Sequence, residues 1–513
     1  MSQIFPARLT RSPRPFDRAA AADVARDWVD QPPEVTALLA ATAGCSPYLK
    51  GLMASERDWL RPALTGAPEA AFDGLLQAAE AAAPDDLGRA LRQAKRRAAL
   101  ITALCDLGGV WDLGQVTGAL TRLADHAVDL SIRTLVADEI RRGKLPGAAP
   151  EDAATGAGMV ALAMGKMGAG ELNYSSDIDL VCLFDETRYP GQEHEARAAF
   201  IKVTRRMTAL LSDTAAGGYV FRTDLRLRPD AAVTPVCLSM AAAESYYEGE
   251  GRTWERAAYI KARPCGGDLA AGARFLKTLT PFVWRKHLDF AAIQDAHDMR
   301  LRIRDHRRLN GPVTVEGHNM KLGQGGIREI EFFTQTRQLI AGGRDPGLRD
   351  RTTEGGLAAL AARGWIPAEV AEELTTLYRA HREVEHRLQM VNDAQTHVMP
   401  TSPEGVARIA AFCGQDEAAF RSDLLARLAR TEALTEGFFA PGGGQAGAEA
   451  VPELSDSARA IVEGWQSYPA LRSDRAQAIF RRLRPALLRR LMRAANPDEA
   501  LVTLDGFLAG LPA

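Results

Sequence analysis

Residues 158–185 read GMVALAMGKMGAGELNYSSDIDLVCLFD, and this stretch decides the fold. An apolar run from Met159 to Met164 ends at a glycine-rich segment, and a second apolar run with β-favouring residues covers Leu180 to Phe184. The pattern predicts a strand, a glycine turn, a polar loop and a second strand. Asp177 and Asp179 stand at the start of that strand, and side chains alternate in an extended segment, so both carboxylates point to one face. Two carboxylates this close call for a divalent cation such as Mg²⁺ or Mn²⁺.

A third carboxylate follows in GYVFRTDLRLRP, residues 218–229. Apolar and polar residues alternate along this segment, which predicts a third strand with one buried face. Its polar face carries Asp224 among three arginines, one of them Arg226. Beside Asp177 and Asp179, Asp224 would complete a metal ligand set, and the arginines would be left for phosphate oxygens. Each motif alone is more often a solvated turn or a salt-bridged exposed face, but the combination predicts a site that handles phosphoryl groups.

The composition limits the class of protein. With 513 residues, 46% of them hydrophobic, the chain is long enough for about two to four domains with sizeable cores. The formal net charge of −2 provides no overall field for nucleic acid, so we expect no nucleic-acid partner. The cysteines show neither CxxC nor zinc spacing and predict reduced thiols in a cytoplasm. Because the sequence has no apolar run of about 18 residues and no signal-peptide core, we expect neither a membrane span nor secretion.

The remainder of the chain has helical periodicity, so we expect a mostly α, α+β fold. The expected parts are an N-terminal helical region (1–145), a catalytic sheet domain (146–275), a helical bundle (276–440) and a linker with C-terminal helices (441–513). Turn-rich text at 146–155 and Gly/Pro-rich text at 441–457 support the first and last boundaries. Residues 1–16 are expected to form a loosely held arm, and residues 193–212 a helix that crosses the sheet.

Three charged segments allow both a functional and a structural interpretation. Basic residues at 92–97 suit either an acidic partner or a solvated helix face, and the solvated face is the favoured interpretation. WERAAYIKAR, residues 254–263, is expected to be a helix that either binds phosphate through Lys261 or packs on the sheet, and the two remain equal. Glu329 and Glu331 are expected to form salt bridges with arginines such as Arg328 or Arg337 rather than to belong to a site.

Two further segments carry weak signals. His297-Asp298 is similar to a metal phosphohydrolase pair, but an ordinary surface helix is favoured because further ligands at suitable spacing are missing. An arginine run at 481–493 suits either nucleic acid or the docking of a helix on an absent carboxyl-terminal half.

Five long motifs carry a family resemblance. The glycine turn, Ser175-Ser176, the acid pair and the later acid-bearing segment resemble the nucleotidyltransferase superfamily that includes polymerase β. Within it, Gly165-Lys166 resembles the glutamine synthetase adenylyltransferase and adenylyl-removing enzymes, and the resemblance covers roughly residues 15–510. The matching motifs are GKMGAGELNYSSDIDL (165–180), FRTDLRLRP (221–229), YYEGEGRTWERAAYIKARP (246–264), KLGQGGIREIEFFTQ (321–335) and VEHRLQMVNDAQTHVMP (384–400).

The resemblance implies a polymerase β-like sheet flanked by helical domains. Members carry two such domains in tandem and this chain has one, which looks like the first because of residues 173–176 and 254–263. After Pro229 the chain departs from the family's Phe-Gly turn, which puts the adjoining loop in doubt. The site residues implied are Asp177, Asp179 and Asp224 as catalytic residues and ligands of two Mg²⁺ ions, with Gly165, Lys166, Ser176 and Arg226 toward nucleotide and phosphate.

The implied activity is the adenylyl-removing one: inorganic phosphate attacks the adenylylated tyrosine of glutamine synthetase and releases ADP. The implied partners are glutamine synthetase, the PII signal protein, nucleotide and phosphate. Two alternatives remain open. One is a domain that uses ATP to attach nucleotide to a protein hydroxyl. The other is a regulatory binding module without chemistry, against which the three intact acids argue.

Overall fold

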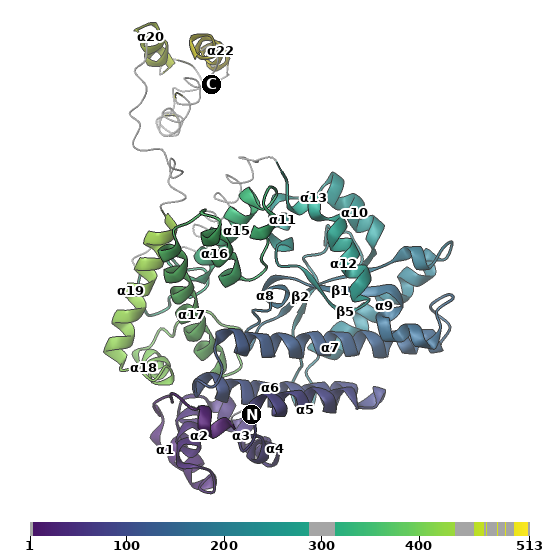
Figure 1. Cartoon of the computed structure of the whole chain (residues 1–513), viewed down its shortest axis with the longest axis vertical. Helices are drawn as coiled ribbons and strands as arrows, with labels where there is room; N and C mark the ends of the chain where they lie inside the picture. The colour runs from purple at the N-terminus through teal and green to yellow at the C-terminus, as the bar shows by residue number, and fades with distance from the viewer. Residues whose placement is uncertain are drawn as a thin grey trace. The chain divides into compact units, whose positions relative to one another are not determined.

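The computed structural model describes residues 4–286, 313–436, 456–465 and 497–510, with the single residues 468, 480 and 488. The chain divides into two compact units, Met1–Gly437 and Phe438–Ala513. The fold is α+β and mostly helical, with one small mixed sheet, which confirms the predicted class (Figure 1). Among the described residues no helix combines the length and the apolar character needed to cross a membrane. His297-Asp298 and the arginine run at 481–493 lie outside the described residues, except for Leu488.

The N-terminal part of the first unit is helical. Its longest helix, α7, is fixed at its start by a capping box, in which Gln115 N–H donates to the Asp112 carboxylate at 2.8 Å and Asp112 N–H donates to Gln115 Oε1 at 3.0 Å. In Figure 1, α6 and α7 lie side by side below the sheet, and both contribute to the same apolar core. The helices are α1 (Arg18–Asp27), α2 (Pro33–Cys45), α3 (Pro47–Ser55), α4 (Arg57–Ala63), α5 (Pro68–Glu80), α6 (Leu87–Leu107) and α7 (Leu113–Arg141).

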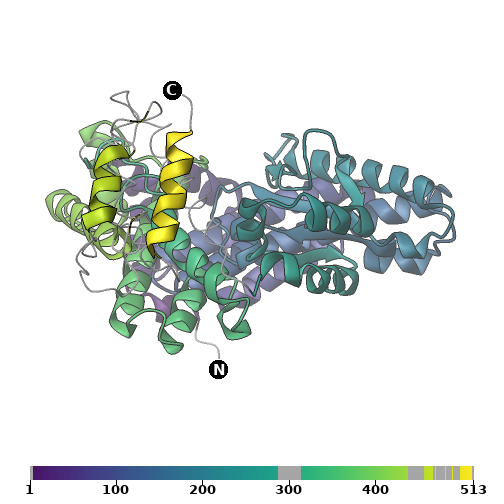
Figure 2. The same cartoon turned by 90° about the horizontal axis from the view of Figure 1, so that it is seen from above.

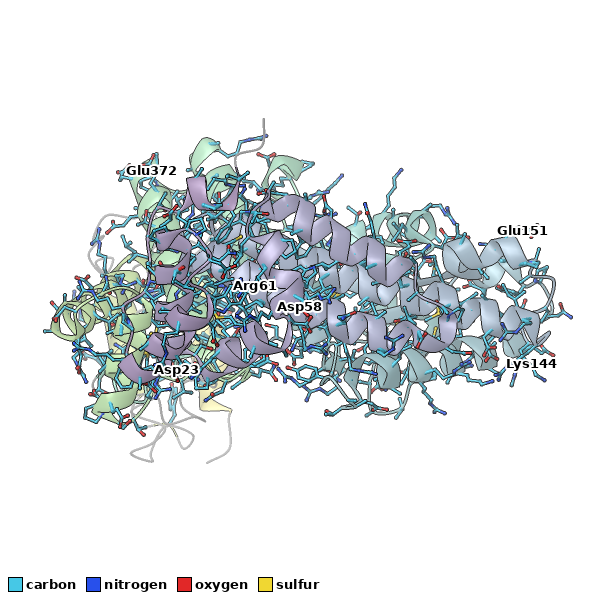
Figure 3. The ribbon with its side chains drawn as sticks, turned by 90° about the horizontal axis from the view of Figure 1, so that it is seen from below. Asp23, Asp58, Arg61, Lys144, Glu151 and Glu372 are labelled. Carbon is cyan, nitrogen blue, oxygen red and sulfur yellow. The ribbon has the colours of Figure 1, made fainter. Side chains whose placement is uncertain are left out.

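The surface of these helices carries their charged side chains. Figure 3 shows Asp23 of α1 and Asp58 and Arg61 of α4 on the face seen from below. The Arg61 guanidinium lies over the Trp28 ring, 4.7 Å from its centroid, and pairs with Asp30. The N-terminal arm is held more firmly than predicted, because Phe5 is fully buried and Thr10 N–H donates to Gly108 O at 2.9 Å.

The sheet is built on two central antiparallel strands. Met159 pairs with Phe184 and Ala163 with Leu180, so the two apolar runs of the sequence form β1 and β2, as predicted. β5 pairs antiparallel with β1, and β3 and β4 pair parallel with the other edge of β2. The strands are β1 (Met159–Ala163), β2 (Ile178–Phe184), β3 (Thr223–Asp224), β4 (Cys237–Ser239) and β5 (Arg263–Gly267).

Both faces of the sheet are covered. Even-numbered residues of β2, such as Leu180 and Cys182, belong to the core shared with α7 and α9, whereas Val181 and Leu183 belong to a second core shared with the helices after β4. Seen from above in Figure 2, the teal helices that follow β4 lie in front of the sheet and the purple N-terminal helices behind it. The covering helices are α8 (Gly165–Ala169), α9 (Glu193–Ser212), α10 (Met240–Gly249), α11 (Thr253–Tyr259), α12 (Leu269–Thr278) and α13 (Thr280–Val283).

The predicted third strand is much shorter than expected. Only Thr223 and Asp224 pair with β2, and the prediction of a strand across residues 218–229 is wrong for the rest. The chain turns away because Arg226 N–H donates to Asp224 Oδ1 at 2.8 Å, while the Arg228 guanidinium donates to the carbonyls of Leu225 (2.8 Å), Ala231 (2.8 Å) and Thr234 (3.1 Å). These hydrogen bonds fold a compact loop where alternation alone predicted a strand.

A group of helices follows the sheet domain in the first unit. α17 is the longest of them, and with α18 and α19 it encloses a core around Leu388, Phe420 and Leu424. The glycines at 323, 325 and 326 form a turn before α15. The helices are α15 (Ile327–Ala341), α16 (Thr353–Ala362), α17 (Ala368–Met390), α18 (Pro403–Phe412) and α19 (Glu417–Glu436).

Short 3-10 helices join several of these elements, and they are η1 (Phe5–Arg8), η2 (Pro84–Asp86), η3 (Pro150–Gly158), η4 (Glu186–Arg188) and η5 (Pro346–Leu348). The second unit contains α20 (Asp456–Gly464) and α22 (Pro497–Ala509). Trp465 is fully buried there, and its indole N–H donates to Asp505 at 2.9 Å.

The basic segment of α6 was predicted to be a solvated helix face, and this is wrong. Lys95 is buried and pairs with Asp393 at 2.8 Å, while Arg96 and Arg97 both pair with the buried Glu56. A run of charged residues forms a solvated helix face only when no other part of the chain packs over it. Here α4 and the loop after α17 do.

Candidate active site

Two of the three predicted catalytic acids face each other across paired strands. Asp179 of β2 is the register partner of Asp224 of β3 in a parallel pair. Asp177 directly precedes β2, two positions before Asp179, so alternation places it toward the same face. Ile178 between them is fully buried on the opposite face, whereas both acids stay partly exposed. One acid thus comes from each of two neighbouring strands and one from the segment directly before β2, and their joint role as a metal site stays a prediction.

The charges of the three acids act on one another. Burial, and then the negative charges of Asp177 and Asp224, raise the pKa of Asp179 to about 6. Lys321 and Arg226 oppose this increase. A carboxyl group held in this state is a strong site for a positive charge, because a cation relieves the repulsion that raises its pKa.

The third acid already has a positively charged partner. Arg226 donates through Nε to Asp224 Oδ2 at 2.8 Å and also pairs through its terminal nitrogen. Hydrogen bonding from Arg226 holds the pKa of Asp224 below its usual value. The Arg226 side chain is 83% exposed, so this guanidinium lies at the open side of the site, where a phosphate group could compete for it.

Gly165 brings the backbone of the glycine turn against Asp179. Its φ of +54° lies in the left-handed region, and a Cβ built on it would stand 2.7 Å from Asp179 Oδ2. Met164 N–H donates to the Asp179 carbonyl at 2.9 Å, which fixes the same two segments from the backbone side. Only glycine leaves the Asp179 carboxylate this position.

The donor set suits a divalent cation, but its arrangement is not that of a closed metal site. Three carboxylates are the oxygen ligands that Mg²⁺ and Mn²⁺ prefer, and burial together with the charges of Asp177 and Asp224 raises the pKa of Asp179. In the part of the chain that the structure describes, however, no three His, Cys, Asp or Glu side chains lie close enough to hold one ion as they stand. Arg226 occupies Asp224, so a cation shared by all three acids would take the place of this guanidinium.

Lys166 lies one residue beyond Gly165 and is held by α17. Its Nζ donates to both carboxylate oxygens of Glu385 at 3.0 Å, and Glu385 is fully buried. Burial lowers the pKa of Lys166 to about 7, although Glu385 acts in the opposite direction. The lysine predicted to point toward phosphate therefore has a protein partner here.

The two serines before the acids differ in their surroundings. Ser175 Oγ donates to the Asp393 carbonyl at 2.9 Å and accepts from Arg222 Nη2 at 3.0 Å, so it anchors the loop. Ser176, the predicted phosphate contact, is buried directly before Asp177. Its role toward phosphate stays a prediction.

The segment 254–263 is a helix only in its first part, so the prediction of a helix across all of it is wrong, and Arg263 already belongs to β5. Its helical part ends at Tyr259, and Lys261 lies buried beyond it, where Nζ donates to Glu171 and Glu331 at 3.2 Å each. Arg328 pairs with Glu331 at 3.4 Å, which confirms one of the predicted salt bridges and adds Lys261 to it. Burial would lower the pKa of Lys261, but the two carboxylates outweigh it and raise it.

Sequence reasoning missed the polar face of α17. Arg382, Glu385, His386 and Gln389 are all essentially buried, and their spacing places them on one side of the helix. The signal was present in REVEHRLQ, residues 382–389, because polar residues that recur at intervals of three and four also mark a helix face. From sequence alone, a polar helix face is predicted to be exposed to solvent. In this fold residues 171–175, a second polar segment, cover it.

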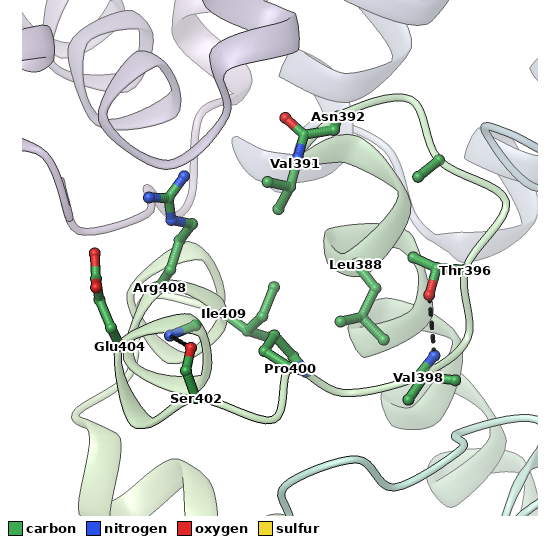
Figure 4. A pocket seen from close by; sticks show the side chains of 12 residues that line it. Leu388, Val391, Asn392, Thr396, Val398, Pro400, Ser402, Glu404, Arg408 and Ile409 are labelled. Carbon is green, nitrogen blue, oxygen red and sulfur yellow. Dashed lines mark hydrogen bonds between the residues drawn. The ribbon is translucent and has the colours of Figure 1, made fainter.

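A surface pocket of about 380 Å³ lies near the end of α17, not at the acids. Figure 4 shows Leu388, Val391 and Ile409 as its apolar part, with Arg408 and Glu404 of α18 at its edge. The three acids, by contrast, lie at the start of β2 and on the neighbouring β3, outside the pocket lining. The chemistry-bearing residues and this hollow are therefore separate features.

Comparison with known proteins finds two family models and several curated relatives that are similar to this chain. Residues 36–278 match the family model described as glutamate-ammonia ligase adenylyltransferase, and residues 296–439 match the one described as GlnD PII-uridylyltransferase. Curated relatives are named bifunctional glutamine synthetase adenylyltransferase/adenylyl-removing enzyme. One from Rhodopseudomonas palustris (strain TIE-1) is 43% identical over 98% of this chain and 55% of its own length. One from Xanthobacter autotrophicus is 43% identical over 100% of this chain and 54% of its own. The chain spans about half the length of the curated relatives it matches.

Proposed function

The chain is a relative of one half of the bifunctional glutamine synthetase adenylyltransferase/adenylyl-removing enzymes, and from this we propose that it is the amino-terminal, adenylyl-removing half. In the proposed reaction an oxygen of inorganic phosphate attacks the phosphorus of the AMP group on a tyrosine of glutamine synthetase. The bond from phosphorus to the tyrosine oxygen breaks, ADP leaves, and the proton of hydrogen phosphate ends on the tyrosine oxygen. The observation that carries the proposal is the meeting of Asp179 with Asp224 across β2 and β3, with Asp177 beside them.

In this proposal Asp177, Asp179 and Asp224 hold divalent metal. Bound there, Mg²⁺ would neutralise charge on the attacking and leaving oxygens, worth several kcal/mol. The raised pKa of Asp179 and the type of donor support the assignment. Arg226, which now pairs with Asp224, would transfer to a phosphate oxygen when the metal takes its place.

The glycine turn orients the substrate phosphates in the same proposal. Gly165 leaves room for a phosphate to approach the backbone of α8, because it has no side chain. Ser176 is placed directly before the acids, and its hydroxyl can donate to a phosphate oxygen. Lys166 contributes positive charge from one residue beyond Gly165, while Glu385 holds it in place.

A second candidate function runs in the opposite direction. The model that matches residues 36–278 is described as an adenylyltransferase, which favours attachment of AMP from ATP to a protein hydroxyl. A non-catalytic binding module is a weaker alternative, because such a module has no need for three interacting acids. We also propose the PII signal protein as a partner. The support is that residues 296–439 match a family model described as GlnD PII-uridylyltransferase.

The test is to supply the chain with each substrate pair in parallel. One reaction contains adenylylated glutamine synthetase, phosphate and Mg²⁺, and the other contains unmodified glutamine synthetase, labelled ATP and Mg²⁺. The proposal expects ADP in the first reaction and no labelled synthetase in the second. Label incorporated in the second reaction, with no ADP in the first, would replace the proposed function by the adenylylating one.

A further inference from the structure

We propose that the buried polar face of α17, centred on Glu385, holds the segment 165–177 in the conformation that presents the acid pair. Glu385 would then be a positioning residue for the candidate active site, although it lies in another part of the fold. The inference deepens the proposed function and rests on it for its kinetic readout.

Glu385 is the centre of the contact between the two segments. Lys166 Nζ donates to both of its oxygens at 3.0 Å, and Asn173 Nδ2 donates to Oε2 at 2.7 Å. His397 Nδ1 lies 2.6 Å from Oε1, and Arg382 Nε lies 3.2 Å from Oε2. One buried carboxylate therefore binds two residues of the turn and two of its own helical domain.

The other polar residues of α17 continue this contact along the segment. Arg382 donates to the Glu171 carbonyl at 2.7 Å and also bonds to Asn173 Oδ1, which lies 3.3 Å from His386 Nε2. Gln389 Oε1 accepts from Ser175 N–H at 3.5 Å. Residues 171, 173 and 175 are thus each held by α17, in a region that is neither helix nor strand.

The loop after α17 extends the same contact toward the acids. The Asp393 carbonyl accepts from Ser175 Oγ at 2.9 Å, and its carboxylate accepts from Lys95 Nζ at 2.8 Å and from the Tyr219 hydroxyl at 3.2 Å. Arg222, next to β3, donates to the same serine. Ser175 therefore stands two residues before Asp177 with contacts to both acid-bearing segments and to α17.

A turn without regular secondary structure has few backbone hydrogen bonds of its own, so its conformation depends on such side-chain contacts. These contacts are buried or partly buried, where a hydrogen bond to a charged group is strong and an unpaired group is costly. Loss of the Glu385 charge should therefore loosen the turn and displace Asp177 and Asp179. Residues that orient metal-binding side chains in this way typically change activity by about 10- to 100-fold when removed.

The experiment compares Glu385→Gln with Glu373→Gln in the full chain. Both glutamates lie on α17, but Glu373 pairs with Arg430 at the surface, with 39% of its side chain exposed. For Glu385→Gln we expect kcat for ADP release to fall about 10- to 100-fold, with the KM for adenylylated synthetase within about twofold of wild type. Glu373→Gln should match wild type in both parameters. An equal loss in both variants, or unchanged kcat in folded Glu385→Gln, would overturn the proposal.

Amide hydrogen exchange supplies a readout that needs no activity. Peptides covering residues 165–177 should exchange faster in Glu385→Gln than in wild type, while peptides of α1 and α2 exchange equally. Unchanged exchange in residues 165–177 would also overturn the proposal. If wild type releases no ADP, the proposed function fails, yet this measurement still decides whether Glu385 holds the turn.

Ser175→Ala keeps the proposal testable if Glu385→Gln does not fold. It removes the hydrogen bond to the Asp393 carbonyl and leaves every charge of the buried contact in place. Faster exchange confined to the peptides around residues 171–177, with a lower kcat, is the expected result. A Ser175→Ala enzyme with wild-type exchange and kcat would contradict a positioning role for this contact.

Discussion

Replacing Gly165 by alanine should separate catalysis from stability. Gly165 is the first residue of α8 and Gly170 directly follows the helix, and both have positive φ, +54° and +77°. An alanine in this left-handed region costs about 1 to 2 kcal/mol at either position. A Cβ at Gly170 meets open space, whereas one at Gly165 stands 2.7 Å from Asp179 Oδ2. Gly170→Ala is therefore the matched control for backbone strain.

The clash at Gly165 falls on the carboxylate and not on the backbone. To reach ordinary contact, which starts at 3.4 Å, Oδ2 must retreat by about 0.7 Å, and a side-chain rotation can supply this movement. The extra loss of stability should therefore be small. A displacement approaching 1 Å at a reacting group can cost about 100-fold in rate, so we expect kcat to fall by about 10- to 100-fold.

The assay measures ADP release for rate and urea unfolding for stability in both variants. We expect similar unfolding free energies for Gly165→Ala and Gly170→Ala, with only the first losing activity. If the two lose activity equally, the contact between Gly165 and Asp179 does not matter for the reaction. If Gly165→Ala retains activity within about threefold of wild type, the position assigned to Asp179 is refuted.

Three further predictions follow from the charges. Asp179→Asn removes a charge whose burial, and then whose repulsion by Asp177 and Asp224, raise the pKa of this group to about 6, so urea unfolding should show a gain of about 1 to 3 kcal/mol at pH 7 while kcat falls at least about 100-fold. For the wild type, Mn²⁺ titrations should give an affinity that is constant above pH 6 and falls up to about tenfold per pH unit below it, because the ion then has to displace a proton from Asp179. Between about pH 4 and 6 this proton stabilises the folded state, since Asp179 in the unfolded chain has already released it. Lys261→Met leaves Glu171 and Glu331 with a buried, unbalanced charge and should cost about 3 to 5 kcal/mol in urea unfolding, whereas the exposed Lys277→Met should change it by less than about 0.5 kcal/mol.

The two central strands could be predicted because their signals are local. Apolar runs broken by glycine define β1 and β2, and alternation alone places Asp177 and Asp179 on one face. The pairing of Asp224 with Asp179 was also within reach, since the polar stripe of residues 218–229 has the right phase there. The length of that strand could not be predicted, because the hydrogen bonds of Arg226 and Arg228 turn the chain after two paired residues.

Charged residues were the main source of error, for a physical reason. Lys95 and Lys166 carry charges that normally remain in water, so sequence alone favours exposure or a ligand for them. In the fold each meets a carboxylate from the region after residue 384, Asp393 or Glu385, far away along the chain. Pairing between such distant segments leaves no periodic signal in either one. The family resemblance included the motifs at 165–180 and 384–400, but it did not indicate that these two segments contact each other.

The origin of the β-phosphate of ADP tests the central claim most directly. Adenylylated glutamine synthetase is incubated with the chain, Mg²⁺ and ³²P-labelled inorganic phosphate, and the nucleotides are separated. The proposed phosphorolysis predicts labelled ADP, in an amount equal to the AMP lost from the synthetase and at least about 100-fold less with Asp179→Asn. Release of unlabelled AMP, or labelled ADP formed equally fast by Asp179→Asn, would contradict it.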